Sequence, residues 1–260
     1  MHSHRPGTAE MKKAFELTFS NGSTTHAIQV DRGADLSAAL HELDFHRSFR
    51  TLVLVGGAGG LGKAELDSLR PLFIEVLAPL AATLGAAVVD GGTDAGVMRL
   101  MGQARAETNA TFALVGVVAI GMVTLPDTQL PALDTALLES HHTHFVLVPG
   151  SQWGDESPWL SRVAGTLAQG APSVTVLVNG GKTAWQDVLQ SVKARRPVIV
   201  VGGSGRTADL LAGALRGEIA DERARELSAS GLLRAVDLKA SADTLTRTIE
   251  QSLLLNDLGA

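Results

Sequence analysis

The chain has 260 residues, 45% of them hydrophobic but only 4% aromatic, and a formal net charge of −5. This length suffices for one large α/β domain or two small ones, and an aliphatic core suits the buried strands of a parallel sheet. The sequence contains no cysteine, which excludes disulfides and thiolate sites. Without a basic tract, a membrane-length apolar run or a signal-peptide core, the sequence predicts a cytoplasmic protein that binds neither nucleic acid nor membrane.

The N-terminal region predicts a tail, a hairpin and a helix. We expect residues 1–12 to form a flexible tail. Residues 14–30 alternate apolar and polar side chains around Asn21-Gly22, which is typical of a β-hairpin, and this hairpin should cover an edge of the fold. Asp35 then suits the N-cap of a helix that runs to about His46.

From residue 50 onward, short apolar stretches alternate with stretches of helical periodicity. The expected strands are 51–55, 86–90, 112–120, 144–148, 174–178, 197–201 and 232–238. The expected helices are 66–84 (broken or kinked at Pro71 and Pro79), 96–107, 160–168, 184–193, 208–215, 221–227 and 242–255. This alternation predicts an α/β fold with a Rossmann-like, doubly wound, mostly parallel sheet. We expect a single domain over 13–260, with its core at 50–215 and a C-terminal helical extension at 216–260.

A glycine-rich turn follows four of these strands. The turns are Gly56–Gly62, Gly91–Gly96, Asn179–Thr183 and Gly202–Gly205. Because the carboxyl ends of parallel strands meet at one edge of a sheet, we expect the four turns to converge on one crevice. Glycine-rich turns that lead into helices offer backbone N–H groups to phosphates, so the pattern predicts a nucleotide-sized ligand.

The last of these turns carries the strongest anion-binding pattern. Its glycines permit a tight turn, and Ser204 or Thr207 suits the N-cap of the following helix. Free N–H groups and the positive end of the helix dipole should then point at one place, where Arg206 adds a guanidinium suited to phosphate or carboxylate.

The first turn fits two nucleotide-binding patterns. GAGGLG at 57–62 matches the dinucleotide fingerprint, for which Asp90 at the next strand end would hold a ribose. GAGGLGK at 57–63 also matches the phosphate loop, but Ala64 replaces the Ser or Thr that would bind magnesium. A tight turn without any ligand is the alternative.

The second and third turns contain polar residues that admit a structural as well as a ligand-binding role. Thr93 or Asp94 suits the cap of the helix 96–107. Lys182 offers a point charge to an anion, but an exposed lysine at a helix start is the alternative.

The segment 149–158 predicts either a lid or a surface turn. Trp153 suits stacking on a base, or packing on the surface. Glu156 and Arg162 lie six residues apart, so they need not share a helix face; they suit either ligand contacts or a capping carboxylate and a solvated arginine.

Three histidines, His141, His142 and His144, precede or begin a strand. Histidine clusters bind metals, but we expect ordinary histidines at a loop-to-strand junction here and no metal site.

Several stretches together resemble a known family, over roughly residues 50–215. In order they are GGTDAGVMRLMGQA, HHTHFVLVPG, Trp153–Arg162, VTVLVNGGKTAWQDV and PVIVVGGSGRTADLLA. They are similar to the N-terminal homology region of melastatin-type TRP channels, whose prokaryotic relatives belong to the SLOG superfamily. The resemblance implies a Rossmann-like fold that binds nucleotide derivatives, with ADP-ribose-like molecules the leading class.

The resemblance also implies roles for single residues. Arg206 matches the family arginine of the GSGR turn, which contacts ligand in some channels, and Arg162 matches an arginine that follows the family's glutamate position, here Glu156. Leu160 stands where some members have a second ligand-contacting arginine.

The superfamily's cytokinin-activating enzymes share a PGGxGTxxE motif whose glutamate is catalytic. The corresponding stretch here is NGGKTAWQD, in which Asn179, Thr183 and Ala184 depart from the motif. Asp187 takes the place of the glutamate and is one methylene shorter.

We therefore expect a stand-alone ligand sensor that binds ADP-ribose, NAD or a similar nucleotide, requires no cofactor, and acts through a homodimer, a homo-oligomer or an unidentified effector protein. One alternative is a nucleotide N-glycosidase with Asp187 or Glu156 as the catalytic carboxyl. Another is an NAD(P)-dependent oxidoreductase, for which the chain, with no tyrosine, lacks a Tyr-Lys pair. The expected ligand-binding residues are Gly57, Ala58, Gly59, Gly60, Gly91, Gly92, Thr93, Asp94, Trp153, Glu156, Arg162, Gly180, Gly181, Lys182, Thr183, Gly203, Ser204, Gly205 and Arg206.

Overall fold

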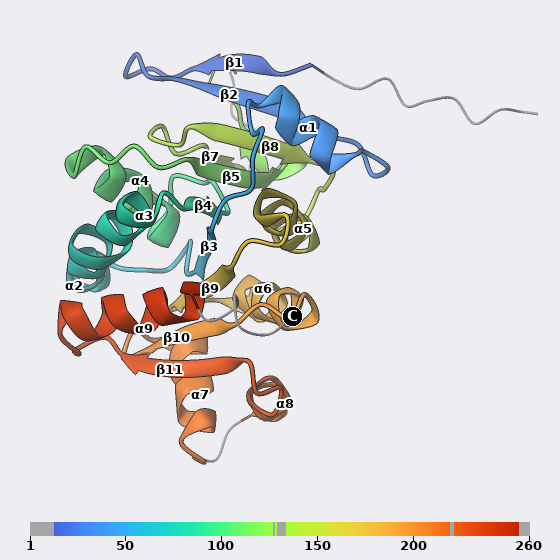
Figure 1. The fold of residues 1–260 in the computed structure, drawn as a ribbon. Coiled ribbons are helices and arrows are strands. Elements are labelled where there is room, and N and C mark those ends of the chain that lie inside the picture. The colour runs from blue at the N-terminus through green and yellow to red at the C-terminus, as the bar shows by residue number, and fades with distance from the viewer. Residues whose placement is uncertain (1–12, 127, 129–133, 219–220, 255–260) are drawn as a thin grey trace, which may run out of the picture.

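Figure 1 shows the computed structural model of the chain, which describes residues 13–126, 128, 134–218 and 221–254. The expected tail, 1–12, lies outside the described residues. A nine-stranded sheet forms the centre of the fold. From one edge to the other its strands are β1 (Phe15–Thr18), β2 (Thr24–Gln29), β8 (His144–Val148), β5 (Leu114–Ala119), β4 (Ala87–Asp90), β3 (Thr51–Gly56), β9 (Ser173–Val178), β10 (Val198–Gly202) and β11 (Leu233–Asp237).

Helices cover both faces of this sheet (Figure 1). One face carries α1 (Leu36–Glu42), α5 (Ser157–Ala168), α6 (Lys182–Lys193), α7 (Arg206–Leu215) and α8 (Glu222–Ser228). The other carries α2 (Lys63–Pro71), α3 (Ala78–Leu84), α4 (Gly96–Glu107) and α9 (Ala242–Leu254). All neighbouring strands are parallel except β1 and β2. The expected α/β fold, with a Rossmann-like doubly wound sheet, is confirmed.

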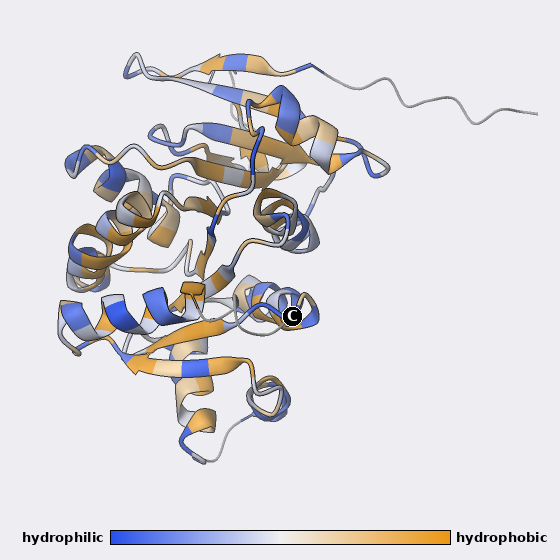
Figure 2. Cartoon of the chain, in the orientation of Figure 1, coloured by the Kyte–Doolittle hydropathy of each residue, from blue (hydrophilic) through white to orange (hydrophobic). Residues whose placement is uncertain are grey.

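Alternating strand side chains build two separate apolar layers. Val53 and Val55 pack on the α5 side of the sheet, whereas Leu52 and Leu54 pack on the α4 side. A strand that is buried on both faces has no polar alternation, which is why these segments are apolar throughout. Figure 2 shows the consequence, with hydrophobic strands between helices whose outer faces are hydrophilic.

The N-terminal hairpin extends the sheet, as expected. β1 and β2 pair antiparallel, and β2 pairs parallel with β8, so the hairpin covers the β8 edge. Leu17 and Phe19 of the hairpin are buried against Phe145 and Leu147 of β8. At the opposite edge β11 pairs with β10, at the strand expected over 232–238.

The helix expected at 66–84 starts earlier and is not interrupted by its prolines. α2 contains Pro71 and continues into a π-helical segment, Leu72–Leu77, which continues into α3 with Pro79 in its first turn. The wider turn accommodates a residue that has no N–H, so the chain does not break. Asp35, by contrast, caps α1 as expected, because its carboxylate accepts from the N–H groups of Ser37 and Ala38.

No helix within the described part of the chain combines the length and the apolar character that crossing a bilayer requires.

Candidate functional site

The strand order creates a crevice at the carboxyl end of β3. β4 lies on one side of β3 and β9 on the other, while the helices that follow them, α4 and α6, cover opposite faces. Strands that diverge in this way leave a gap at their carboxyl ends, where α/β proteins bind ligands.

The turns after β3, β4 and β9 touch one another. A Cβ at Gly57 would lie 2.7 Å from Oδ1 of Asn179, and a Cβ at Gly96 would lie 1.8 Å from the Gly57 carbonyl oxygen. That carbonyl accepts a hydrogen bond from the Val97 N–H at 3.0 Å. Only glycine permits these approaches, so its role here is first of all to let the turns meet.

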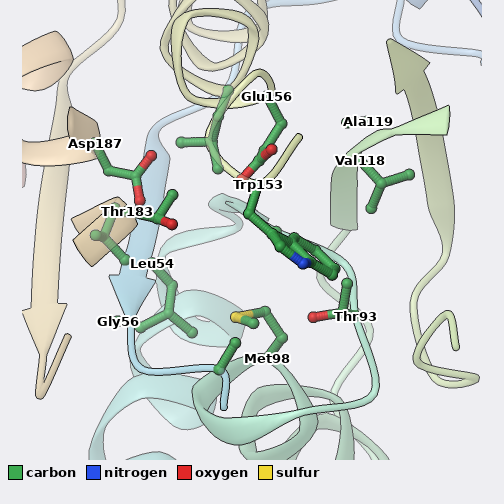
Figure 3. Close-up of a pocket in the computed structure, with 14 residues that line it drawn as sticks. Leu54, Gly56, Thr93, Met98, Val118, Ala119, Trp153, Glu156, Thr183 and Asp187 are labelled. Atoms are coloured by element: carbon green, nitrogen blue, oxygen red, sulfur yellow. The ribbon is translucent and has the colours of Figure 1, made fainter. Parts of the chain in front are cut away.

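A pocket of about 80 Å³ lies in this crevice, smaller than the roughly 300–1,000 Å³ of typical ligand sites. Figure 3 shows that its walls come from β3, the turn after β4, the end of β5, the 149–158 segment and the start of α6. The lining residues are Leu54, Val55, Gly56, Ala58, Gly91, Thr93, Met98, Val118, Ala119, Trp153, Glu156, Leu160, Thr183 and Asp187.

Trp153 lies across this pocket. Its indole extends from the loop near Glu156 toward Thr93 and Val118 (Figure 3), and 49% of the residue remains exposed. Asp155 holds the start of this loop through the N–H groups of Ser151 and Gln152. The loop therefore presents a large aromatic face at the pocket rather than burying it in the core.

Two carboxyl groups face the same pocket. Oδ1 of Asp187, one turn into α6, is buried and has no hydrogen-bond partner among the described residues. Burial raises the pKa of Asp187 to about 7; the Ser157 hydroxyl opposes this shift, and the charge of Glu156 adds to it. The Glu156 carboxylate accepts from the Gly154 N–H at 2.9 and 3.1 Å, and burial raises its pKa as well. Near neutral pH, Asp187 can thus act as a hydrogen-bond donor or acceptor.

The turn after β10 differs from its prediction. Neither Ser204 nor Thr207 caps α7, which begins at Arg206 with Gly205 as its N-cap. The Ser204 hydroxyl instead accepts from the Asn179 N–H and donates to the Val201 carbonyl. Serine therefore ties this turn to the turn after β9.

The N–H groups at the start of α7 are not free either. Those of Thr207 and Ala208 donate to the carbonyls of Gly180 and Asn179, and the Gly203 N–H donates to Asp209. Three N–H groups that were expected to face an anion at this helix start are therefore already occupied by neighbouring oxygens.

In contrast, the described residues leave the backbone N–H groups at the start of α6 free to bind a ligand. Among the described residues, the N–H groups of Lys182, Thr183 and Ala184 have no hydrogen-bond partner. Thr183 lines the pocket, and Lys182 is exposed beside it. Within the described structure, the turn after β9 thus has more free N–H groups than the turn after β10.

Arg206 lies at the rim rather than in the pocket. Its exposed guanidinium donates to the carbonyl oxygens of Gly59 and Gly60 at 3.2 and 2.9 Å, and a Cβ at Gly181 would lie 3.9 Å from its Nη1. It makes no ion pair among the described residues. Its charge is therefore held between the first and third turns without a counterion.

The turn after β4 contributes fewer ligand-facing groups than predicted. Gly91 and Thr93 line the pocket, but neither Thr93 nor Asp94 caps α4, whose N-cap is Ala95. Asp94 pairs with Arg99, with Nε and Oδ1 2.7 Å apart. Asp90 is fully buried, so it is not placed to hold a ribose.

The candidate residues between 153 and 162 do not all face the pocket. Glu156 faces the pocket, whereas Arg162 is exposed, and its guanidinium lies 4.5 Å from the ring centroid of Trp159. Sequence reasoning did not assign the lining residues Met98, Val118 and Ala119. Two features of the sequence could have indicated that these residues line the pocket. Met98 lies within the GGTDAGVM motif, and Val118 and Ala119 end a strand at the same edge of the sheet.

His142 was expected to be an ordinary histidine at a loop-to-strand junction, but it lies in a buried ionic network. Its ring is buried between the carboxylates of Asp90 and Glu139. Among the described residues, no group of three or more histidine and carboxylate side chains is arranged to hold a metal ion.

Comparisons with known proteins agree with this architecture. The model of a family described as "SLOG in TRPM, prokaryote" matches residues 49–246. The crystal structure of TM1055, a structural genomics target, has a TM-score of 0.53 at 22% identity, over 78% of this chain and 99% of that one. This similarity supports the fold.

Similar curated proteins are cation channels. A transient receptor potential channel subfamily M member-like 2 from Nematostella vectensis is 27% identical over 218 residues, 70% of this chain and 14% of the channel. Member 1 from Mus musculus is 26% identical over 225 residues, 74% and 14% of the two chains. Member 2 from Mus musculus is 28% identical over 196 residues, 62% and 13%. The chain thus spans only a small part of the channels it matches.

Proposed function

The chain belongs to the prokaryotic SLOG-in-TRPM family, and from this premise we propose that it binds a nucleotide derivative, with ADP-ribose-like molecules the leading class. The observation that carries the proposal is the pocket at the carboxyl end of β3, which combines an exposed indole, unpartnered polar groups and apolar walls. This combination is typical of small-molecule sites.

Trp153 would stack on the base or on another planar group of the ligand. The ring lies over the pocket and is about half exposed, so a planar ligand would gain contact area without unfolding the core. Binding would be signalled by movement of the 149–158 segment, by a change of oligomeric state or through an effector protein.

The phosphates would lie at the rim near Gly181. Arg206 and Lys182 supply positive charge there, and the open N–H groups of the α6 start supply donors. The pocket itself contains two carboxyl groups and no basic side chain among its lining residues. This polarity favours a phosphate outside the pocket and an uncharged hydroxylated group inside.

Isothermal titration calorimetry with ADP-ribose, cyclic ADP-ribose, NAD and AMP tests the proposal. We expect at least one to bind, and Arg206→Ala to weaken that binding by about 1.5–3 kcal/mol, as expected for loss of a charged hydrogen bond. Arg247→Ala removes an exposed arginine of α9 and serves as the control, with unchanged affinity. Absence of binding by all four compounds, or equal affinity of wild type and Arg206→Ala, contradicts the assignment.

A second candidate function, nucleotide N-glycosidase, is favoured by the carboxyl pair. The protonated Asp187 would give its proton to the departing base as the C1′–N bond breaks. Glu156 would take a proton from the water whose oxygen forms the new bond to C1′.

Chromatography of NAD, AMP and ADP-ribose after incubation with the protein separates the two candidates. Release of a free base that is lost in both Asp187→Asn and Glu156→Gln supports the enzyme. Binding without any product supports the sensor.

A further inference from the structure

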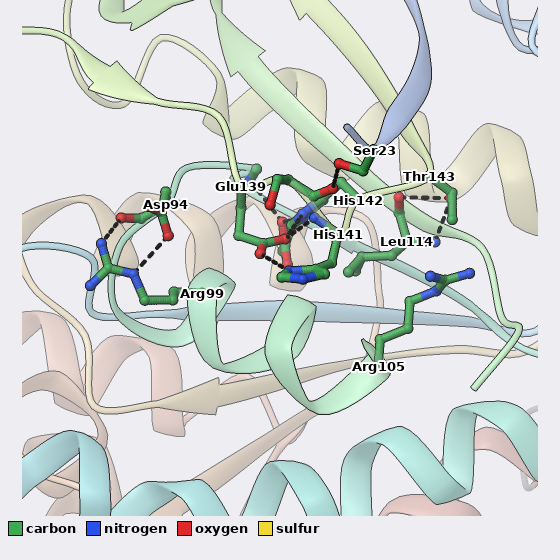
Figure 4. Close-up of polar contacts among 12 residues, drawn as sticks. Ser23, Asp94, Arg99, Arg105, Leu114, Glu139, His141, His142 and Thr143 are labelled. Carbon is green, nitrogen blue, oxygen red and sulfur yellow. Dashed lines mark hydrogen bonds and ion pairs between the residues drawn. The ribbon is translucent and has the colours of Figure 1, made fainter. Parts of the chain in front are cut away.

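A buried ionic network lies behind the turn after β4. His142 is 2% exposed; its Nε2 lies 2.8 Å from Oδ1 of Asp90, and its Nδ1 lies 2.9 Å from Oε2 of Glu139. Glu139, also 2% exposed, accepts from the N–H of His141 and contacts the His141 ring at 2.6 Å. Figure 4 shows Glu139, His141 and His142 together above α4.

The same groups hold the backbone of the turn Gly91–Asp94. Oδ1 of Asp90, which contacts His142, also accepts from the Gly92 N–H at 2.7 Å. The Gly92 carbonyl in turn accepts from the Glu139 N–H at 3.0 Å, and the Asp94 N–H donates to the Leu137 carbonyl at 2.7 Å. The segment 137–142 is thus bound to the turn by two backbone hydrogen bonds, at Gly92 and at Asp94. The His142 side chain adds a third connection through Asp90.

The turn is also closely packed against its neighbours. Gly92 has a φ of +61°, and a Cβ there would lie 2.9 Å from Gly116 Cα and from the Phe145 ring. The His142 ring stacks on that same Phe145 ring, with centroids 5.3 Å apart. Across the network, a Cβ at Gly102 of α4 would lie 2.0 Å from Oε2 of Glu139. The ring and both carboxylates therefore occupy a fixed space beneath the turn.

We propose that His142 is a positioning residue for the pocket: held between Asp90 and Glu139, its ring fixes the turn Gly91–Asp94 so that Thr93 lines the pocket. The significance of this position for ligand binding rests on the proposed function. The positioning itself is a property of the ligand-free protein.

The surrounding charges keep the imidazole protonated. Burial alone lowers the pKa of His142, but Asp90 and Glu139 outweigh burial and raise the pKa to about 9. The other titratable or charged groups that face the network are His141 on the same segment and Arg105 from α4, both of which interact with Glu139. His142 thus supplies the buried positive charge between the two carboxylates.

Amide hydrogen exchange in the ligand-free protein at pH 7 tests the proposal. In His142→Gln we expect the Gly92 and Asp94 amides to exchange about tenfold faster or more, while those of Asn179 and Ala208 in the other turns stay unchanged. His144→Gln is the matched control, because His144 faces His26 and Phe45 and stays out of the network. Unchanged exchange at Gly92, or equal acceleration in all turns, overturns the proposal.

The wild-type protein provides a second measurement in case His142→Gln does not fold. Protection of the Gly92 and Asp94 amides should fall in step with the nuclear magnetic resonance titration of the His142 ring near pH 9, while Asn179 keeps its protection. Protection that does not follow the ring overturns the proposal.

ADP-ribose titration of His142→Gln and His144→Gln completes the test. If ADP-ribose binds the wild type, its affinity should fall about fivefold or more in the first variant and stay unchanged in the second; an equal affinity in both overturns the role in binding. If no nucleotide binds the wild type, the proposed function fails while the exchange result stands.

Discussion

Asp90 and Asp187 lie on two sides of the same crevice, and their surroundings differ. Asp90, at the end of β4, is fully buried; its Oδ1 contacts His142 and the Gly92 N–H, and its Oδ2 has no partner among the described residues. Asp187, in α6, lines the pocket, and its buried Oδ1 likewise has no partner in the described part of the chain. An unpartnered buried oxygen therefore does not by itself mark a candidate ligand-binding carboxyl group; its position at a pocket wall, away from an opposite charge, does.

The largest effect should come from breaking the paired carboxylate. Asp90→Ala leaves the buried His142 charge with one partner fewer and should lower the free energy of unfolding by about 3–5 kcal/mol. Urea unfolding at pH 7 measures it. Asp94→Ala removes a half-buried carboxylate paired with Arg99 and should cost less than about 1 kcal/mol. An equal loss of unfolding free energy in the two variants would contradict the special role of the buried, paired carboxylate.

The paired site should also give the protein a pH dependence on the alkaline side. The folded-state pKa of His142, about 9, lies above its ordinary value of 6.5. The stabilisation is therefore complete below pH 6.5 and is lost as pH rises through 9, by about 1–3 kcal/mol. Urea unfolding should show this fall in the wild type and in His144→Gln but not in His142→Gln.

The unpaired site should also lose stability as pH rises, but over a lower pH range and because its charged form is the unfavourable one. A carboxyl whose folded-state pKa is raised, here to about 7, stabilises the fold only while protonated. That contribution is present below the ordinary pKa near 4 and is lost as pH rises through 7. Asp187→Asn should therefore be more stable than wild type at pH 8, by about 1–3 kcal/mol. A gain as large at pH 3 as at pH 8 would show that ionisation is not the cause.

Trp153 should have the smallest effect on stability. Because the indole is half exposed, Trp153→Ala should change the free energy of unfolding by less than about 0.5 kcal/mol. The affinity for ADP-ribose should fall by about 1–3 kcal/mol if the ring stacks on the base. Calorimetry should show recovery in Trp153→Phe. Full affinity in Trp153→Ala would remove the stacking role.

The sheet and its order of elements were predictable because parallel strands that are buried on both faces consist of uninterrupted apolar residues in the sequence. The runs at 144–148 and 174–178 fall within one residue of β8 and β9. The π-helical segment that follows Pro71 was not predictable, because it depends on packing that no local pattern records.

The glycine-rich turns show that a sequence motif alone does not determine which turn has free N–H donors. The turns after β9 and β10 have similar sequences. Yet the N–H groups that begin α6 have no partner among the described residues, whereas those of Thr207 and Ala208 in α7 donate to the turn after β9. Which turn keeps its donors depends on contacts between residues far apart in sequence, such as Ser204 with Asn179. For His142, the nearby Glu139 was the available signal.

The two hydrogen bonds from Arg206 to Gly59 and Gly60 have a kinetic consequence. The two bonds use two of the five guanidinium N–H groups, so three remain for an anion. If a phosphate binds there as proposed, the Gly59 and Gly60 carbonyl oxygens beside it would repel it. Binding would then favour a rotation of the peptide planes at 59–60, and Gly60, at a φ of +77°, rotates with little steric barrier. Association would in that case depend on how fast this short segment reorients.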